Sequence, residues 1–213
     1  MKRMTILVAV VCGFAAFGAR AMSPAAMTNA LFAAVASGNL AKVKLLVKEG
    51  AKVGVRDQFG DTPLHWASGH GYLPVVKFLI SDGAEVNARD FHGQTPLFGA
   101  DDAAIADVLI AHGAQVNARD TIGQTPLDRA AWDGRIPVIK VLLAHGAHIN
   151  ARDMNGFTPL DNAAWSGSNS RAVEALLRAH GGVFSRVPGS IPETPKPVAT
   201  PKIKVAGTDL GTH

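Results

Sequence analysis

The sequence predicts an all-α solenoid of about five helix-turn-helix repeats with protruding turn loops. The main evidence is the phrase Thr-Pro-Leu, which begins at Thr62, Thr95, Thr125 and Thr158, at spacings of 33, 30 and 33 residues. Each phrase follows a glycine turn and precedes a second apolar segment that ends in glycine. One such unit cannot cover its own apolar face, so neighbouring units are expected to stack on each other.

Each Thr-Pro-Leu phrase contains the signals that start a helix. The threonine hydroxyl can accept a hydrogen bond from a free N–H group of the first turn. Proline suits the first helical position, because no N–H donor is needed there. The leucine that follows is expected to point into the core. These leucines are Leu64, Leu97, Leu127 and Leu160.

A second helix is expected in each unit, over residues 73–84, 103–114, 136–147 and 170–182. All four segments carry apolar pairs near their ends. Each then reaches a glycine, the residue that most easily adopts the left-handed conformation that ends a helix. The four glycines are Gly83, Gly113, Gly146 and Gly181.

The pattern Asp-x-x-Gly-x-Thr-Pro-Leu-His, followed by two helices and Gly-Ala-x-Val-Asn-Ala, resembles the ankyrin repeat. An earlier segment, 28–51, has the glycine turn and the glycine stop but no Thr-Pro-Leu, and is interpreted as an N-terminal cap. The resemblance implies one ankyrin repeat domain over residues 22–182. Its predicted repeats are 28–56, 57–89, 90–119, 120–152 and 153–182.

Two repeats depart from this pattern. The repeat 90–119 is three residues short, because Asp101 and Asp102 directly follow Thr-Pro-Leu-Phe-Gly-Ala. One turn of its first helix or its connector is expected to be lost, which would leave a notch or kink in the stack. The last repeat has two extra residues around 166–170.

The histidine of the Thr-Pro-Leu-His pattern occurs only once, at His65. Phe98, Asp128 and Asp161 replace it in the other repeats. The resemblance implies hydrogen bonds from this histidine between repeats, so we expect those bonds to be rearranged in the three later repeats.

The first 21 residues are predicted to be a cleaved signal peptide. Lys2 and Arg3 precede an uncharged, mainly apolar run over 5–18, and Ala19-Arg20-Ala21 supplies the small residues of a signal-peptidase site. One alternative is a membrane anchor, which would need about 20 apolar residues. Another is a lipoprotein attached through Cys12, which Val11 opposes by its size. Cleavage predicts export to a periplasm or beyond, without stable membrane insertion.

Charge and cysteine content narrow the possible partners. The chain carries a formal charge of +4, but residues 1–21 hold three basic and no acidic residues. The remaining 18 basic and 17 acidic residues give +1, so no nucleic-acid partner is implied. Cys12 is the only cysteine, so the mature chain would depend on its core rather than on disulfides.

The last segment, 183–213, is rich in proline, with glycine, threonine and lysine between the prolines. It has no apolar periodicity, so it is expected to be extended and disordered. It is interpreted as a spacer, as a proline-rich ligand for a groove-binding domain, or as a frayed end.

No catalytic constellation is found, and we expect no catalytic residues, no cofactor and no metal site. His112, His145 and His180 each precede a glycine at the end of a second helix. Stacked helices lie about 8–10 Å apart, too far for these side chains to share one ion. We expect them to interact with helix C-termini instead. The loop asparagines are expected to satisfy their own turns. They are Asn87, Asn117 and Asn150.

The ankyrin resemblance implies that partners bind to the turn tips and to the inner face of the first helices. Apolar side chains occupy the tips, and exposed apolar rows tend to be binding sites. The candidate tip residues are Phe59, Phe91, Ile122 and Met154.

The three tryptophans are expected to differ. Trp66 directly follows Thr-Pro-Leu-His and is assigned to the core. Trp132 and Trp165 occupy equivalent positions in adjacent repeats, where they could stack and contact a partner, or simply pack. Three polar residues are expected to surround them: Arg129, Asp133 and Asn162.

These observations predict an exported, monomeric, non-enzymatic scaffold that binds a protein or peptide through its concave face and turn tips. A regulator or inhibitor of an exported enzyme is the first alternative, with the tail as a possible tether. A secreted effector that acts on host proteins is another. An enzyme or a metal-dependent protein is a further alternative, which the sequence opposes.

Overall fold

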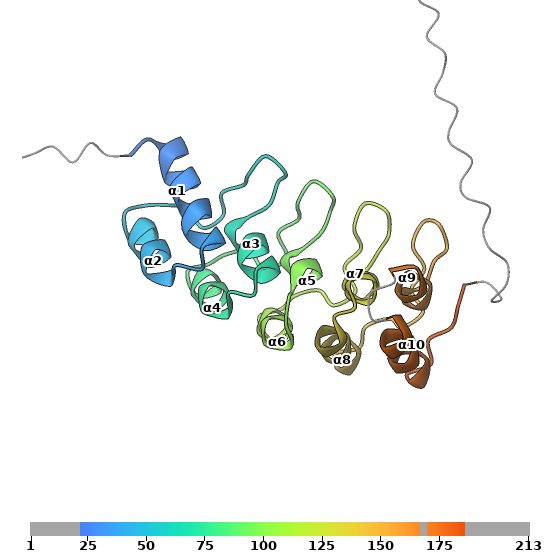
Figure 1. Cartoon of the computed structure of the whole chain (residues 1–213). Helices are drawn as coiled ribbons and strands as arrows, with labels where there is room; N and C mark the ends of the chain where they lie inside the picture. Colours follow the sequence, from blue (N-terminus) through green and yellow to red (C-terminus); the bar gives the residue numbers. More distant parts are fainter. Residues whose placement is uncertain (1–21, 167–169, 186–213) are drawn as a thin grey trace, which may run out of the picture.

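A computed structural model describes residues 22–166 and 170–185. Within these ranges ten helices stack in five antiparallel pairs (Figure 1). They are α1 (Pro24–Ala36), α2 (Leu40–Lys48), α3 (Pro63–Gly69), α4 (Leu73–Ser81), α5 (Pro96–Gly99), α6 (Ala103–Ala111), α7 (Pro126–Asp133), α8 (Ile136–Ala144), α9 (Pro159–Ser166) and α10 (Ser170–Ala179). The predicted signal segment, residues 167–169 of the lengthened connector and the tail from residue 186 lie outside the described residues.

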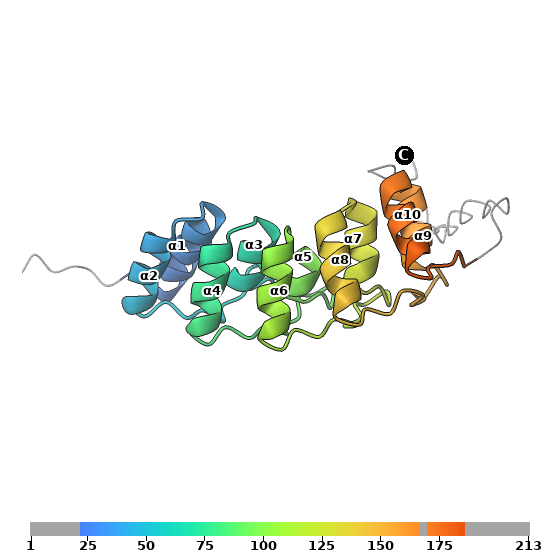
Figure 2. The same cartoon turned by 90° about the horizontal axis from the view of Figure 1, so that it is seen from below.

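The helices form two layers. The odd-numbered helices make the inner layer, and the even-numbered helices run beneath them (Figures 1 and 2). Loops between the pairs project beyond the inner layer as a row of fingers (Figure 1). The part of the chain that the structure describes contains helices and no strands, so the predicted all-α solenoid is confirmed. No described helix is long and apolar enough to cross a membrane.

The core lies between the two layers. The leucine of each Thr-Pro-Leu phrase is at most 1% exposed, as predicted. It packs with apolar residues of the outer layer such as Leu79, Leu109 and Leu142, which are fully buried. Burial of one such side chain contributes about 1.5–3 kcal/mol, so these residues stabilise the contact between the two layers.

The predicted start of the inner helices is confirmed. Thr62, Thr95 and Thr125 are N-cap residues, and a proline follows each at the first helical position. The first helix, α1, begins at Pro24, before the predicted first repeat over 28–56. Its N-cap is Ser23, whose hydroxyl accepts a hydrogen bond from the N–H of Ala26 at 3.2 Å.

Backbone hydrogen bonds join each finger to the next. The donor is an N–H group at the start of one finger tip, and the acceptor is a carbonyl of the preceding tip. The pairs are Phe91 to Phe59 (3.0 Å), Thr121 to His92 (2.8 Å) and Met154 to Ile122 (3.0 Å). Because the bonded residues recur at the same place in each repeat, the tips stay aligned.

Two side-chain ladders reinforce this alignment. Arg89 Nη1 donates to the carbonyl of Gly93 in its own finger, at 2.9 Å, and to the carbonyl of Arg119 in the next, at 2.7 Å. Arg119 repeats the pattern toward Arg152, at 2.8 Å. The guanidinium groups therefore link the fingers.

The loop asparagines form the second ladder, and here the sequence-based prediction is wrong. Asn87 Nδ2 donates to the carbonyl of Gly113 at 2.8 Å, and its Oδ1 accepts from the N–H of Gln115 at 2.9 Å. Asn117 makes the same two kinds of bond one repeat later, and Asn150 makes them in the repeat after that. These amides therefore join one repeat to the next rather than satisfying their own turns.

The shortened third repeat loses part of its inner helix, as predicted. Helix α5 has four residues, about one turn, and α6 begins soon afterwards with Asp102 as N-cap. Asp102 Oδ1 accepts from the N–H of Ile105 at 2.8 Å. Arg135 of the next repeat reaches into this region, where its guanidinium donates to the carbonyls of Phe98 and Ala100.

The hydrogen bond that His65 makes between repeats is replaced by other contacts in the later repeats, as predicted. His65 Nε2 contacts the carbonyl of Gln94 in the next repeat at 3.2 Å. Two repeats later, Asp128 Oδ1 instead accepts from Asn162 Nδ2 at 3.0 Å. Phe98 offers no polar atom, and the Thr95 hydroxyl beside it has no hydrogen-bond partner among the described residues.

We expect Arg135→Ala to lower the free energy of unfolding by about 2–4 kcal/mol, because it leaves buried carbonyls without donors. Urea denaturation of the purified chain measures this loss. Arg129→Ala is the matched control, since Arg129 shares the partner Asp133 but is about half exposed. Arg129→Ala should lower the free energy of unfolding by less than about 1 kcal/mol. Equal losses in both variants would contradict the role assigned to Arg135.

A second prediction concerns pH. Burial raises the pKa of Asp128 to about 6, although hydrogen bonds from Thr125 and Asn162 lower it in part. Because this pKa lies above the unfolded value, the favourable contribution of Asp128 is present at low pH and is lost as pH rises through about 6. Urea denaturation measures the free energy of unfolding of Asp128→Asn and of the parent. The value for Asp128→Asn should rise by about 2–3 kcal/mol relative to the parent as the pH is raised from about 4 to about 7.5. A difference that stays constant with pH would contradict this.

Candidate protein-binding surface

The finger tips expose their apolar side chains in a row. The exposed fractions are 54% for Phe59, 70% for Phe91, 47% for Ile122 and 77% for Met154. Bonds between neighbouring tips hold these residues in register along one side of the inner layer (Figure 1). All four predicted tip residues are therefore accessible to a partner.

Two tryptophans add to this surface from the inner helices. Trp132 of α7 is 44% exposed and Trp165 of α9 is 57% exposed. The Trp165 ring packs against Phe157 at the base of its own finger, with ring centroids 5.2 Å apart. The ring contacts of the described residues do not pair the two indoles, so the stack considered from the sequence is not formed.

Trp66 differs from the other two, in agreement with its assignment to the core. It is partly buried against the core, and its indole Nε1 donates to Asp57 Oδ2 at 2.9 Å. Its ring meets Phe32 edge to face and stacks on His70 with centroids 5.5 Å apart. Trp66 therefore has fixed partners on three sides.

The three polar residues predicted near the tryptophans have different roles. Asn162 is buried and donates to Asp128, so its prediction as a partner-binding residue at the surface is wrong. Asp133 accepts from Arg129 Nε at 2.9 Å and from Arg135 Nη2 at 2.7 Å, so it orients the buried guanidinium. Arg129 remains about half exposed on the same helix as Trp132.

The candidate histidines lie at helix C-termini, as expected. His112 Nδ1 bonds to the carbonyl of Val108 at 2.8 Å, and His180 Nδ1 bonds to the carbonyl of Leu176 at 2.9 Å. Among the described residues no three His, Cys, Asp or Glu side chains gather as a metal site would require. The absence of a metal, cofactor or catalytic residue stays a prediction.

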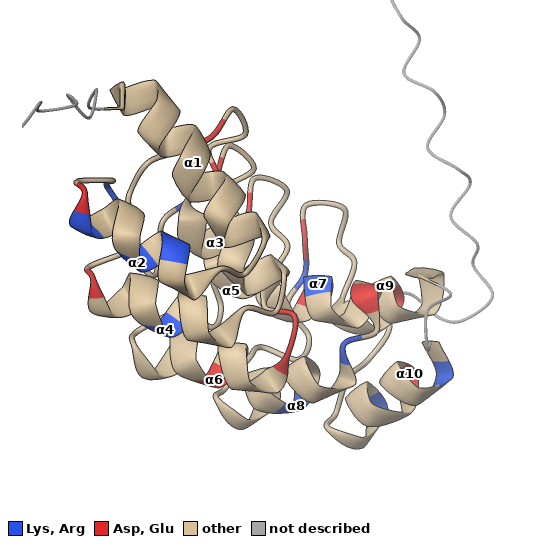
Figure 3. Cartoon of the chain, turned by 60° about the vertical axis from the view of Figure 1, so that its left-hand side comes forward, with Lys and Arg blue, Asp and Glu red and all other residues tan. Residues whose placement is uncertain are grey.

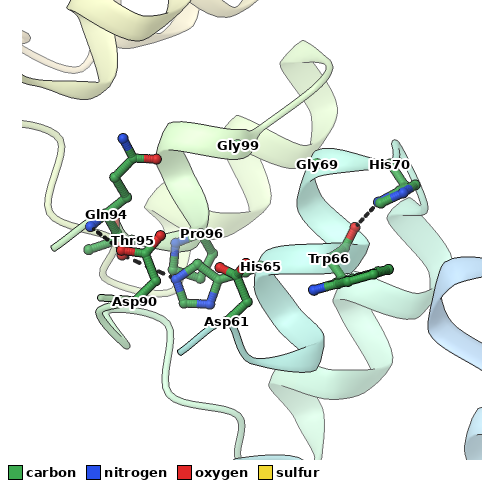
Figure 4. A pocket seen from close by; sticks show the side chains of 10 residues that line it. All are labelled: Asp61, His65, Trp66, Gly69, His70, Asp90, Gln94, Thr95, Pro96 and Gly99. Carbon is green, nitrogen blue, oxygen red and sulfur yellow. Dashed lines mark hydrogen bonds between the residues drawn. The ribbon is translucent and has the colours of Figure 1, made fainter. Parts of the chain in front are cut away.

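A cleft of about 230 Å³, which the sequence-based predictions did not include, lies between α3 and α5 (Figure 4). It exists because Gly69 stands where later repeats carry Trp132 and Trp165, and Gly99 stands where they carry Arg129 and Asn162. These two glycines inside the repeated phrase are the signal that could have revealed it. The cleft is lined by Asp61, His65, Trp66, Gly69, His70, Asp90, Gln94, Thr95, Pro96 and Gly99.

Lysine is confined to one layer of the described helices, whereas acidic residues occur in both. Every lysine of the described helices lies in the outer layer. Acidic residues lie at the bases of the fingers, on the inner helices α7 and α9 and on the outer helices α6 and α10 (Figure 3). The lysines are Lys42, Lys44, Lys48, Lys77 and Lys140. The inner surface therefore combines exposed apolar groups with carboxylates.

The repeat geometry agrees with a comparison against known families. A family model described as ankyrin repeats in three copies matches residues 14–90, 31–120 and 100–185. The chain belongs to the ankyrin repeat family. Ankyrin repeats present protein-binding surfaces, which agrees with the exposed apolar row.

Curated proteins give a shorter match. Protein phosphatase 1 regulatory subunit 27 of Homo sapiens is 60% identical to this ankyrin repeat protein over 42 residues. The same subunit of Mus musculus matches equally well. The matched segment covers 20% of this chain and 27% of either relative. The similarity therefore concerns about one repeat rather than the whole protein.

We expect replacement of the three tryptophans by alanine to lower the free energy of unfolding by different amounts. Trp66→Ala should lower the free energy of unfolding by about 2–4 kcal/mol, because it empties a packed site and frees Asp57. Trp165→Ala and Trp132→Ala should each cost less than about 1 kcal/mol, because these rings are about half exposed. Urea denaturation measures all three. A loss at Trp132 or Trp165 as large as that at Trp66 would assign them to packing.

Proposed function

We propose that this ankyrin repeat protein is a non-enzymatic scaffold that binds a protein or peptide through its inner face and finger tips. One observation carries the proposal. Of the nine large apolar side chains exposed in the described residues, six lie on the fingers and the inner helices. These are Phe59, Phe91, Ile122, Trp132, Met154 and Trp165.

Exposure of apolar side chains to water is unfavourable in free energy, and a partner that covers them removes this cost. The remaining three exposed apolar residues, Met22, Leu45 and Val183, lie on α2 or near the ends of the described chain. The concentration on one side favours a single extended interface. Tryptophan is common among the residues that dominate binding energy, so Trp132 and Trp165 are the strongest candidates.

Export is part of this proposal. It is supported by the basic start, the apolar run and the Ala-Arg-Ala site within residues 1–21, which lie outside the described residues. Cleavage after Ala21 would release the chain to a periplasm or to the exterior. The mature protein would act as a monomer.

Regulation of an enzyme is the alternative that a specific observation favours. The relative that shares 60% identity over 42 residues is, by its name, a regulatory subunit of a protein phosphatase. A change in the activity of the captured partner would separate a regulator from a passive scaffold. Action on host proteins would differ only in where the partner originates.

The test uses the protein as bait in extract from the exported compartment, followed by calorimetry with the captured partner. Trp132→Ala combined with Trp165→Ala should weaken binding about tenfold or more, because it removes two interface anchors. Leu45→Ala is the matched control, since Leu45 is 53% exposed but lies on the outer helix α2. Parent-like affinity in the double variant would exclude this surface as the main contact.

A further inference from the structure

Two carboxylates line the cleft between α3 and α5. Asp90 Oδ1 accepts from the N–H groups of His92 and Gln94, both at 2.8 Å, while its Oδ2 has no hydrogen bond among the described residues. The carboxylate of Asp61 likewise has none there. The cleft thus presents acceptor oxygens that the described part of the chain does not use.

Other repeats show what normally occupies this place. The equivalent of Asp61 in the next two repeats is Gln94 and then Gln124. Gln94 Nε2 donates to Asp120 Oδ2 at 3.3 Å, which joins its repeat to the following one. Asp61 cannot make the equivalent bond to Asp90, and it brings a second carboxylate beside the first. A local arrangement that costs stability without a structural gain is typical of a functional site.

Nearby cations do not neutralise this pair. The backbone N–H of Thr62 donates to His65 Nδ1 at 3.1 Å, so the proton of the imidazole lies on Nε2 and is donated to the Gln94 carbonyl. His65 is therefore neutral, and burial lowers its pKa. Arg56 is nearby, but its guanidinium donates to the carbonyls of Gly60 and Arg89.

The surroundings of Asp61 disfavour the charged form of its carboxyl group. Burial raises the pKa of Asp61, and the charges of Asp57 and Asp90 raise it further, whereas His65 and His92 would lower it only in their protonated forms. A cation that entered the cleft would offset both the burial and the repulsion.

The other wall of the cleft is aromatic. The rings of Trp66 and His70 are nearly parallel, with an angle of 11° between their planes. The hydrogen bond from Trp66 to Asp57 fixes the indole. Gly69 and Gly99 pack against each other and bring no side chain into the cleft that they line (Figure 4). His70 is also stacked on Tyr72, so these rings form one aromatic column, and an aromatic group next to carboxylates attracts a cation such as a guanidinium group.

The floor of the cleft lacks a donor. Thr95 lines the cleft and is 1% exposed, and its hydroxyl oxygen has no hydrogen-bond partner among the described residues. An N–H group placed at the floor would give this oxygen the partner that it lacks. A guanidinium carries five N–H donors, enough for both carboxylates and this hydroxyl.

We propose that this cleft binds the side chain of an arginine on the partner protein, with Asp61 and Asp90 as acceptors and with Trp66 and His70 as an aromatic wall beside it. The inference rests on the proposed function and specifies the chemistry of the partner. Phe59 and Phe91 at the adjoining finger tips would contact apolar residues on either side of that arginine.

The test is an NMR titration of the ¹⁵N-labelled full chain with the peptide acetyl-Gly-Arg-Gly-amide at low salt. The arginine peptide should produce saturable shifts at the Trp66 indole and at the amides of Gly69, Gln94 and Gly99. The same peptide with citrulline, a neutral isostere of arginine, should bind about tenfold more weakly, because it carries no positive charge to pair with the two carboxylates. Equal affinity for both peptides would overturn the proposal.

Asp61→Gln gives a second, independent readout. It should weaken binding of the arginine peptide about tenfold, while stability measured by urea denaturation stays equal or rises, because glutamine can donate to Asp90. Asp107→Asn on the outer helix α6 is the matched change in charge and should leave affinity unchanged. Parent-like affinity in Asp61→Gln would overturn the proposal.

The two proposals can fail separately. If the arginine peptide does not bind but a captured partner still depends on Trp132 and Trp165, the scaffold function stands and the arginine cleft is rejected. If the peptide binds and no partner depends on these tryptophans, the cleft stands and the interface lies elsewhere.

Discussion

The hydrogen bonds between successive fingers are the constraint on which the rest of the structure depends. Helix packing between repeats is mainly apolar, and apolar contacts are not directional. The bonds from Phe91 to Phe59 and from Arg89 to Arg119 are directional, so they hold neighbouring repeats in one register. That register places the exposed tips in a row and positions the cleft between α3 and α5.

The third repeat shows how the stack tolerates a missing turn. Shortening α5 to four residues would leave the carbonyls of Phe98 and Ala100 without intrahelical donors. Arg135 supplies those donors from the next repeat, and Asp133 orients its guanidinium. Arg135 thus repairs the loss, while Gly99 packs against Gly69 of α3 beside the cleft. The deletion therefore explains the contact from Arg135, whereas the cleft follows from the two glycines, which bring no side chain into it.

Local sequence signals predicted most of the fold. The Thr-Pro-Leu phrases act within one turn of helix, so they correctly located the inner helices, and the three-residue deletion correctly predicted a shortened α5. Exposure of Phe59 and Met154 followed from their place at turn tips. The roles of Asn87, Asn162 and Arg135 did not follow, because each bonds to residues about one repeat away, and those contacts depend on the register of the stack. The cleft was missed for the same reason.

Stability and recognition are therefore carried by different parts of each repeat: bonded backbone at the fingers, and side chains left free above it. Amide hydrogen exchange of the full chain tests this division most directly. Because their N–H groups are bonded to the preceding tip, Phe91, Thr121 and Met154 should exchange slowly, although Phe91 and Met154 expose most of their side chains. Exchange of these three amides at the rates of an unprotected loop would contradict a rigid, aligned row of finger tips.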